Sequence, residues 1–155
     1  MSATPQTQAQ PQSQENRSLK LDFDFAAPPE KVWRALTEKD LLTKWLMPND
    51  MVAKAGHKFQ FRSRPYGKWD GIVNCEILEA TPPKRLRIAW GGVKDVGPDT
   101  VVSWTLTPTA GGTHLHLEQT VAAAETWQSW AYNGAAMGWK KFFGQELPKL
   151  LATLK

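Results

Sequence analysis

The sequence predicts an α+β fold, in which a strongly curved antiparallel β-sheet wraps around one long C-terminal helix. Apolar and polar residues alternate in six short segments between residues 19 and 118, as half-buried strands require. From Trp139 onward the apolar residues recur at spacings of three and four, which is one face of a helix. Because a sheet with one apolar face needs a cover, and only this helix is long enough, we expect the two to pack together.

The first strand is expected over residues 19–25, where four apolar side chains share one face. Two short helices should follow it. Pro28, Pro29 and Glu30 suit the first turn of a helix, and the buried stripe of that helix is Val32, Trp33 and Leu36. The stripe of the second helix is Leu41, Leu42, Trp45 and Leu46.

The other five strands are expected over residues 58–62, 71–80, 85–90, 102–106 and 114–118. Turn residues separate them, for example Pro65-Tyr66-Gly67, Thr81-Pro82-Pro83-Lys84 and Ala110-Gly111-Gly112. Short strands joined by such turns favour an antiparallel meander.

The C-terminal helix is expected to carry two irregularities. Pro148 lacks the N–H that would bond to the carbonyl of Gly144, which predicts a kink. Asn133-Gly134 is expected to separate this helix from a preceding helical piece that contains Trp127 and Trp130.

Composition excludes several classes of protein. The chain has 155 residues, a net charge of +4 and a single cysteine, so it is one domain with neither a disulfide framework nor the charge of a nucleic-acid-binding protein. No apolar run is long enough for a membrane span, and the start of the chain is no secretory signal. We therefore expect a cytoplasmic protein, with a disordered Gln-rich tail over residues 1–17 and a domain over residues 18–155.

Local motifs in a fixed order carry a resemblance to a known family. They are residues 27–37, from Ala27-Pro28-Pro29 to Leu36-Thr37, then Trp45, Gly56 with Phe59, Glu76-Ile77-Leu78-Glu79-Ala80, Pro82-Pro83-Lys84-Arg85-Leu86, Gly112-Thr113 with Leu115 and Leu117, and Gly138-Trp139. With these motifs the chain resembles the START-like SRPBCC superfamily, which has a helix-grip fold. Within that superfamily it resembles the family of activator of heat shock protein 90 ATPase homologues.

The resemblance implies the fold and leaves the role open. Some members of the family resemble co-chaperones that stimulate the heat-shock ATPase, others look like carriers of hydrophobic small molecules, and distant relatives are polyketide cyclases. The resemblance supplies no shared catalytic motif, so the activity has to be argued from the residues of this chain.

The sequence favours binding of an apolar or aromatic small molecule between the sheet and the C-terminal helix. The chain has eight tryptophans, and no periodic stripe accounts for Trp69, Trp127 and Trp130. Indoles without a core position often border a pocket. The predicted ligand-binding residues are Phe61, Trp69, Val73, Trp90, Trp104, Leu117, Trp130 and Met137.

Two other functions remain open at this stage. A co-chaperone-like domain could dock a chaperone or another protein through a basic sheet face made of Arg62, Arg64, Lys68, Lys84, Arg85 and Arg87. An enzyme of cyclase type could use Tyr132 or Gln119 as a proton donor, but the sequence contains no recognisable acid–base pair. We expect no catalytic residue, cofactor, nucleic acid or membrane partner.

His114, His116 and Glu118 form the sharpest chemical pattern, since alternate residues of a strand share one face. They could hold a divalent metal. Leu115 and Leu117 should occupy the covered face, however, so the sequence favours a hydrated sheet surface without metal. Cys75 is expected to be a small buried apolar residue. Asp70 is expected in a turn, where its side chain bonds to the local backbone, and His57 is expected at the surface.

Overall fold

The computed structural model describes residues 18–65, 67, 69–92, 98–121 and 127–154. The predicted tail over residues 1–17 lies outside these ranges. Six strands form one antiparallel sheet in the order β1-β6-β5-β4-β3-β2. Their bounds are β1 Ser18–Phe25, β2 Lys58–Arg62, β3 Ile72–Thr81, β4 Arg85–Trp90, β5 Thr100–Thr109 and β6 Gly112–Val121. The α+β class, the number of strands and their order along the chain are therefore as predicted.

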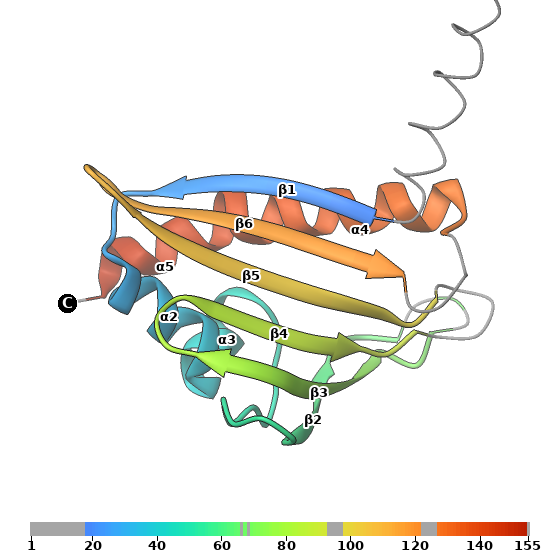
Figure 1. The fold of residues 1–155 in the computed structure, drawn as a ribbon. Helices are drawn as coiled ribbons and strands as arrows, with labels where there is room; N and C mark the ends of the chain where they lie inside the picture. Colours follow the sequence, from blue (N-terminus) through green and yellow to red (C-terminus); the bar gives the residue numbers. More distant parts are fainter. Residues whose placement is uncertain (1–17, 66, 68, 93–97, 122–126, 155) are drawn as a thin grey trace, which may run out of the picture.

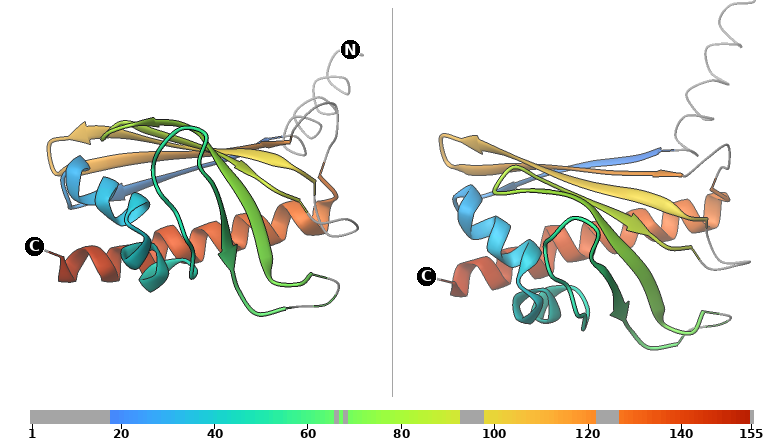
Figure 2. Two further views of the ribbon diagram at one scale, coloured as in Figure 1. Left: turned by 90° about the horizontal axis from the view of Figure 1, so that it is seen from below. Right: turned by 60° about the horizontal axis from the view of Figure 1, so that its bottom comes forward.

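The helices lie on the concave face of this curved sheet (Figures 1 and 2). α2 Pro29–Thr37 and α3 Lys39–Trp45 follow the first strand. The C-terminal helix consists of α4 Ser129–Lys141, a π-helical turn η1 Phe142–Glu146, and α5 Leu147–Thr153. It runs beneath the sheet from end to end, which confirms the predicted helix-grip arrangement.

The C-terminal helix differs from the prediction in two places. The predicted break at Asn133-Gly134 is wrong, because α4 runs through both residues. A single glycine costs an α-helix only about 1 kcal/mol, which packing can offset. The missing N–H of Pro148 is accommodated by the π-turn that precedes it, in which the N–H of Leu147 bonds to the carbonyl of Phe142. The three pieces form one continuous helical rod in Figure 2, without the predicted kink.

Aromatic residues dominate the core between the helix and the sheet. Phe143 is fully buried, and its ring lies 5.0–5.7 Å from those of Phe23, Trp45, Trp104 and Trp139. The indole N–H of Trp45 donates to the carbonyl of Ala35, which fixes α3 against α2. The predicted core positions of Trp45 and Trp139 are thus confirmed, while Trp33 is partly buried against the same core.

Candidate functional site

A cavity of about 540 Å³ lies between the sheet and the N-terminal half of α4. Its sheet side is built at the end where β4 finishes, β5 begins and β6 finishes, because Trp90 pairs with Thr100 and Thr100 pairs with Val121. The volume falls in the range of about 300–1,000 Å³ that small-molecule sites occupy. Trp130 borders the cavity and is 56% exposed, so the cavity opens to solvent on that side.

Four tryptophans line this cavity: Trp69, Trp90, Trp127 and Trp130. Each indole is held by neighbours. The N–H of Trp69 donates to the carbonyl of Ile72 over 2.9 Å, and that of Trp130 donates to Gln128 over 2.5 Å. Trp90 packs edge-on against Trp139 at 5.2 Å, and Trp127 packs edge-on against Tyr132 at 5.6 Å. The walls are therefore flat and largely apolar, and each indole has a partner besides any ligand.

Small residues on α4 form the helix side of the cavity. Ala131, Gly134 and Ala135 follow each other at helical spacing and line it together. A Cβ built on Gly134 would meet no atom within 4 Å. The space thus exists because the residues of α4 that face the sheet here are alanine and glycine, with Trp130 at the border. The C-terminal half of the same helix fills the corresponding space with Trp139, Phe143 and Leu147.

One polar cluster interrupts the apolar lining. Gln119 is 4% exposed and receives a hydrogen bond of 2.7 Å on Oε1 from the indole N–H of Trp139. Its Nε2 donates to the hydroxyl of Thr100 over 2.9 Å, and that hydroxyl donates to the carbonyl of Trp90 over 3.4 Å. Gln119 and Thr100 both line the cavity, so an apolar chamber contains one ordered polar spot.

The structure brings together half of the predicted ligand-binding residues. Trp69, Val73, Trp90 and Trp130 line the cavity. Phe61, Trp104 and Leu117 have the predicted inward orientation but are fully buried in the core instead of lining the cavity. Met137 is 72% exposed on α4 and also lies outside the cavity. Strand parity predicts which face a residue takes, but not which end of the sheet is packed and which is hollow.

Sequence reasoning left several lining residues out of the site. Trp127 lines the cavity. Its sequence signal is that no periodic packing stripe accounts for this tryptophan. For Gln119 the sequence suggests only the role of a proton donor in an enzyme. At Asn133-Gly134 the sequence predicts a break in the helix. A break in the stripe of large side chains on an otherwise apolar helix face would have been the informative pattern for Gly134 and Ala135.

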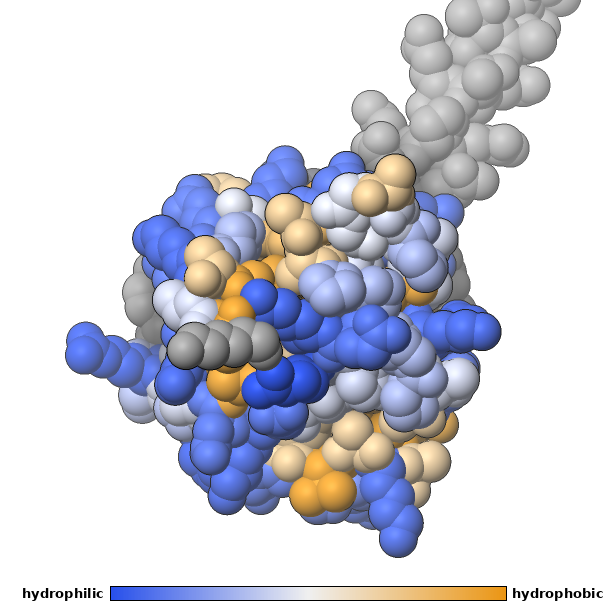
Figure 3. Space-filling model, turned by 90° about the vertical axis from the view of Figure 1, so that its left-hand side faces the viewer, coloured by the Kyte–Doolittle hydropathy of each residue, from blue (hydrophilic) through white to orange (hydrophobic). Residues whose placement is uncertain are grey.

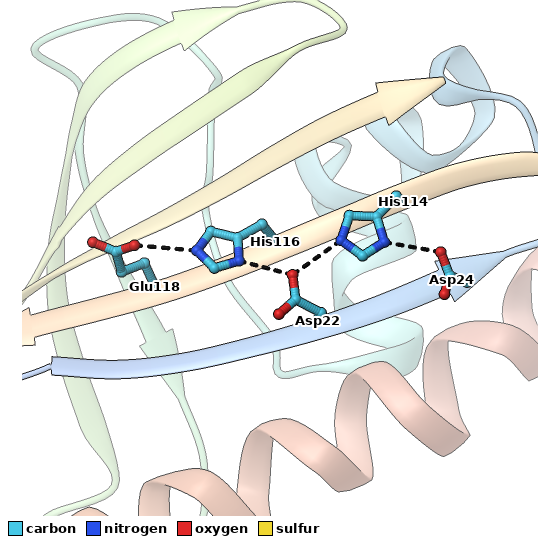
Figure 4. Close-up of polar contacts among 5 residues, drawn as sticks. All are labelled: Asp22, Asp24, His114, His116 and Glu118. Atoms are coloured by element: carbon cyan, nitrogen blue, oxygen red, sulfur yellow. Dashed lines mark hydrogen bonds and ion pairs between the residues drawn. The ribbon is translucent and has the colours of Figure 1, made fainter. Parts of the chain in front are cut away.

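The predicted His114–His116–Glu118 face lies on the convex, exposed side of the sheet, opposite the buried Leu115 and Leu117. There it joins Asp22 and Asp24 of the neighbouring strand in one row of hydrogen bonds (Figure 4). His114 contacts Asp24 and Asp22 over 2.9 Å each, and His116 contacts Asp22 over 2.8 Å and Glu118 over 3.1 Å. Within the described ranges, no three His, Cys, Asp or Glu side chains have the arrangement of a metal site.

The geometry of this row favours doubly protonated imidazoles. All four ring nitrogens face carboxylate oxygens, which only accept, whereas a neutral ring has a single N–H. Hydrogen bonds to Asp24 and then Asp22 raise the pKa of His114 above 6.5, and the hydrogen bond to Asp22 does the same for His116 against the effect of burial. The hydrogen bond from His116 lowers the pKa of Asp22 below 3.8.

These shifts predict a window of pH in which the pairing of β1 with β6 is strongest. The contribution of the two histidines is complete below pH 6.5 and is lost as the pH rises through their folded pKa. That of Asp22 is present above pH 3.8 and is lost as the pH falls through its folded pKa. NMR titration of the ring protons should therefore give pKa values above 6.5 for His114 and His116. All the side chains involved are at least 36% exposed, so the gain in stability is small.

Two substitutions test the connectivity of the row. Asp22→Asn should lower the pKa of both histidines, because Asp22 contacts both rings. Asp24→Asn should lower that of His114 alone. Ordinary pKa values in the unmodified protein, or equal effects of the two variants on His116, would contradict this arrangement.

The remaining chemical candidates have structural roles. Cys75 is buried, and burial raises the pKa of its thiol to about 12, so it is no nucleophile at neutral pH. Asp70 accepts from the backbone N–H of Ile72, as the predicted turn requires. His57 lies at the surface, stacks on Phe59 and contacts the carbonyl of Asp50 over 3.0 Å.

The end of the molecule that carries the β5–β6 hairpin, α2 and α5 is largely hydrophilic, with apolar groups interspersed (Figure 3). Of the predicted basic face, Lys68 lies outside the described residues. Arg62 lies 3.8 Å from Asp50, and Arg87 pairs in register with Glu79. None of the helices that the structure describes is long and apolar enough to cross a bilayer.

Comparison with known proteins places the chain among proteins of the same architecture. The profile of the family "Activator of Hsp90 ATPase homolog 1-like protein" matches residues 26–152. The crystal structure of protein MLL2253 from Mesorhizobium loti is 38% identical, with a TM-score of 0.78 over 90% of this chain and 99% of that one. A Rhodobacter sphaeroides protein is 25% identical, with a TM-score of 0.72 over 90% of this chain and 95% of that one.

A third similar structure is DynU16, a protein from the dynemicin biosynthetic locus. It is 23% identical, with a TM-score of 0.71 over 88% of this chain and 48% of that one, so the likeness concerns the fold alone. No curated protein sequence matches the chain.

Proposed function

The chain belongs to the Activator of Hsp90 ATPase homolog 1-like family, and from this premise we propose that it binds an apolar, aromatic small molecule without transforming it. The observation that carries the proposal is the cavity of about 540 Å³ with four tryptophans in its lining. The binding residues proposed are Trp69, Val73, Trp90, Trp127, Trp130 and the small residues of α4.

The physical chemistry of the cavity sets the affinity to be expected. A ligand of two or three fused rings that buries about 250 Å² of apolar surface gains roughly 6 kcal/mol at 25 cal/mol per Å². Stacking or edge contacts with indoles add about 0.5–1.5 kcal/mol each. Association itself costs about 4 kcal/mol or more, so we expect dissociation constants near millimolar, which reach the micromolar range only if the ligand contacts several indoles.

A titration with 1-aminoanthracene tests the proposal, because this planar apolar compound changes its fluorescence on leaving water. We expect saturable binding at a ratio of one to one, with energy transfer from the tryptophans that line the cavity. Native mass spectrometry should show the same stoichiometry. A signal that rises linearly without saturating would contradict a defined site.

The family also accommodates binding to a protein partner. The described basic residues give that function less specific support: Arg62 lies 3.8 Å from Asp50, and Arg87 is opposite Glu79 in the register of β3 and β4. The cavity carries the more specific structural signal.

A further inference from the structure

Hydrogen-bonding groups in the cavity lining indicate which aromatic ligands the cavity prefers, if it binds them as proposed above. The orientation of the Gln119 amide is determined by its neighbour. The indole of Trp139 can only donate, so the atom of Gln119 that it contacts at 2.7 Å must be the oxygen. The amide nitrogen is therefore the atom directed to Thr100, and it carries two hydrogens.

Each acceptor near this amide already receives one hydrogen bond. Gln119 Oε1 accepts from Trp139, Thr100 Oγ1 accepts from Gln119, and the carbonyl of Trp90 accepts from Thr100. The backbone amides that line the cavity beside them are used as well: the N–H of Gly91 donates to Asn74 and that of Gly92 donates to Asp99. The N–H groups of Gly91 and Gly92 are therefore not available as donors to a ligand.

Other donors, in contrast, remain available. Among the described residues, the hydrogen bonds of Gln119 Nε2 use only one of its two hydrogens. Trp127 also lines the cavity, is 6% exposed, and has a buried indole N–H that finds no partner in the described part of the chain. A buried donor without a partner is costly, and a ligand that supplies an acceptor removes that cost.

We propose that the cavity selects aromatic ligands that carry a carbonyl oxygen, such as ketones or quinones, over hydrocarbons of the same shape. The oxygen accepts a hydrogen bond from the amide hydrogen of Gln119 that no described residue uses. The rings lie against the indoles of Trp90 and Trp69. A site of this kind rejects a ligand without the oxygen because its own donors would then stay unpaired.

The test compares fluorenone with fluorene, which share a tricyclic skeleton and differ in a carbonyl against a methylene group. Their dissociation constants are measured by calorimetry or by displacement of 1-aminoanthracene, in the unmodified protein and in Gln119→Met. We expect the preference for fluorenone to fall about tenfold in the variant, as the loss of one well-placed hydrogen bond predicts. Because the ratio of the two dissociation constants is compared between the two proteins, the difference in solubility between fluorenone and fluorene cancels. Gln145→Met, at an exposed position of η1, is the control and should leave the ratio unchanged.

Infrared spectroscopy provides a second measurement, because Gln119→Met leaves the Trp139 N–H unpaired and could disturb folding. The carbonyl stretch of fluorenone bound to the unmodified protein should lie below its value in hexane, as a hydrogen-bonded carbonyl does. Binding of both compounds with an unshifted stretch, or with an unchanged ratio in a folded variant, would overturn the carbonyl preference and leave the proposed cavity standing. Failure of both compounds to bind would overturn the cavity as a binding site.

Discussion

Replacing Gly134 with leucine is expected to weaken the binding of 1-aminoanthracene by at least about tenfold, which corresponds to about 1.4 kcal/mol, while the protein stays folded. Gly134 lines the cavity from α4, and a side chain placed on it meets no atom within 4 Å of its Cβ. The leucine side chain would therefore occupy the space that the ligand needs without displacing the core.

The stability of the same variant should rise as binding falls. Leucine has a higher helix propensity than glycine by roughly 0.5–1 kcal/mol, and Gly134 lies inside α4. Urea denaturation should show a higher midpoint with an unchanged slope. This opposite movement of stability and binding separates a filled site from a damaged fold.

Gly138→Leu is the matched control, since Gly138 lies one turn further along α4 and a Cβ there also meets nothing within 4 Å. Gly138 does not line the cavity, so this variant should gain similar stability and keep its affinity for the probe. Equal loss of binding in both variants, or full binding in Gly134→Leu, would show that the cavity is not the binding site.

Replacing Phe143 with alanine is expected to have the largest effect on stability, a loss of about 3–5 kcal/mol. Phe143 is fully buried and contacts four aromatic rings, which come from β1, α3, β5 and α4. Removing its ring opens a hole that rigid indoles cannot close, so the cost of the cavity adds to the lost burial. In a domain of this size the midpoint of thermal unfolding should fall by roughly 10–20 °C.

Phe142→Ala provides the comparison at the adjacent position. Phe142 is only partly buried, so the same truncation should cost clearly less in urea and in heat. A similar cost at both positions would mean that the aromatic cluster around Phe143 is not the centre of the core.

Much of the fold could be predicted because it depends on local patterns. In residues 19–25 and 85–90, apolar and polar residues alternate, which predicts one buried and one exposed face. The apolar residues of β1 and β4 are indeed the more buried ones. The π-turn before Pro148 was less accessible. A proline predicts a missing hydrogen bond, but whether the chain kinks or takes in an extra residue depends on what the helix packs against.

The candidate site could be predicted only in part. Trp69 and Trp130 stood out because no stripe needed them, and both line the cavity. Trp104 and Leu117 point to the same helix-covered face of the sheet as Trp90. They lie, however, where Trp139 and Phe143 fill the space between sheet and helix. The difference between a wall and a core residue depends on the opposite helix, which strand periodicity does not describe.

The sequence by itself determined that the protein is an α+β domain with a sheet covered by one terminal helix, and that tryptophans exceed what its packing stripes require. It did so because periodicity and turn residues act over a few neighbours. Only the tertiary structure decided that the helix carries Ala131, Gly134 and Ala135 where the sheet presents Trp90, Thr100 and Gln119. A cavity is a mismatch in volume between two surfaces far apart in the chain, so it exists only once they face each other.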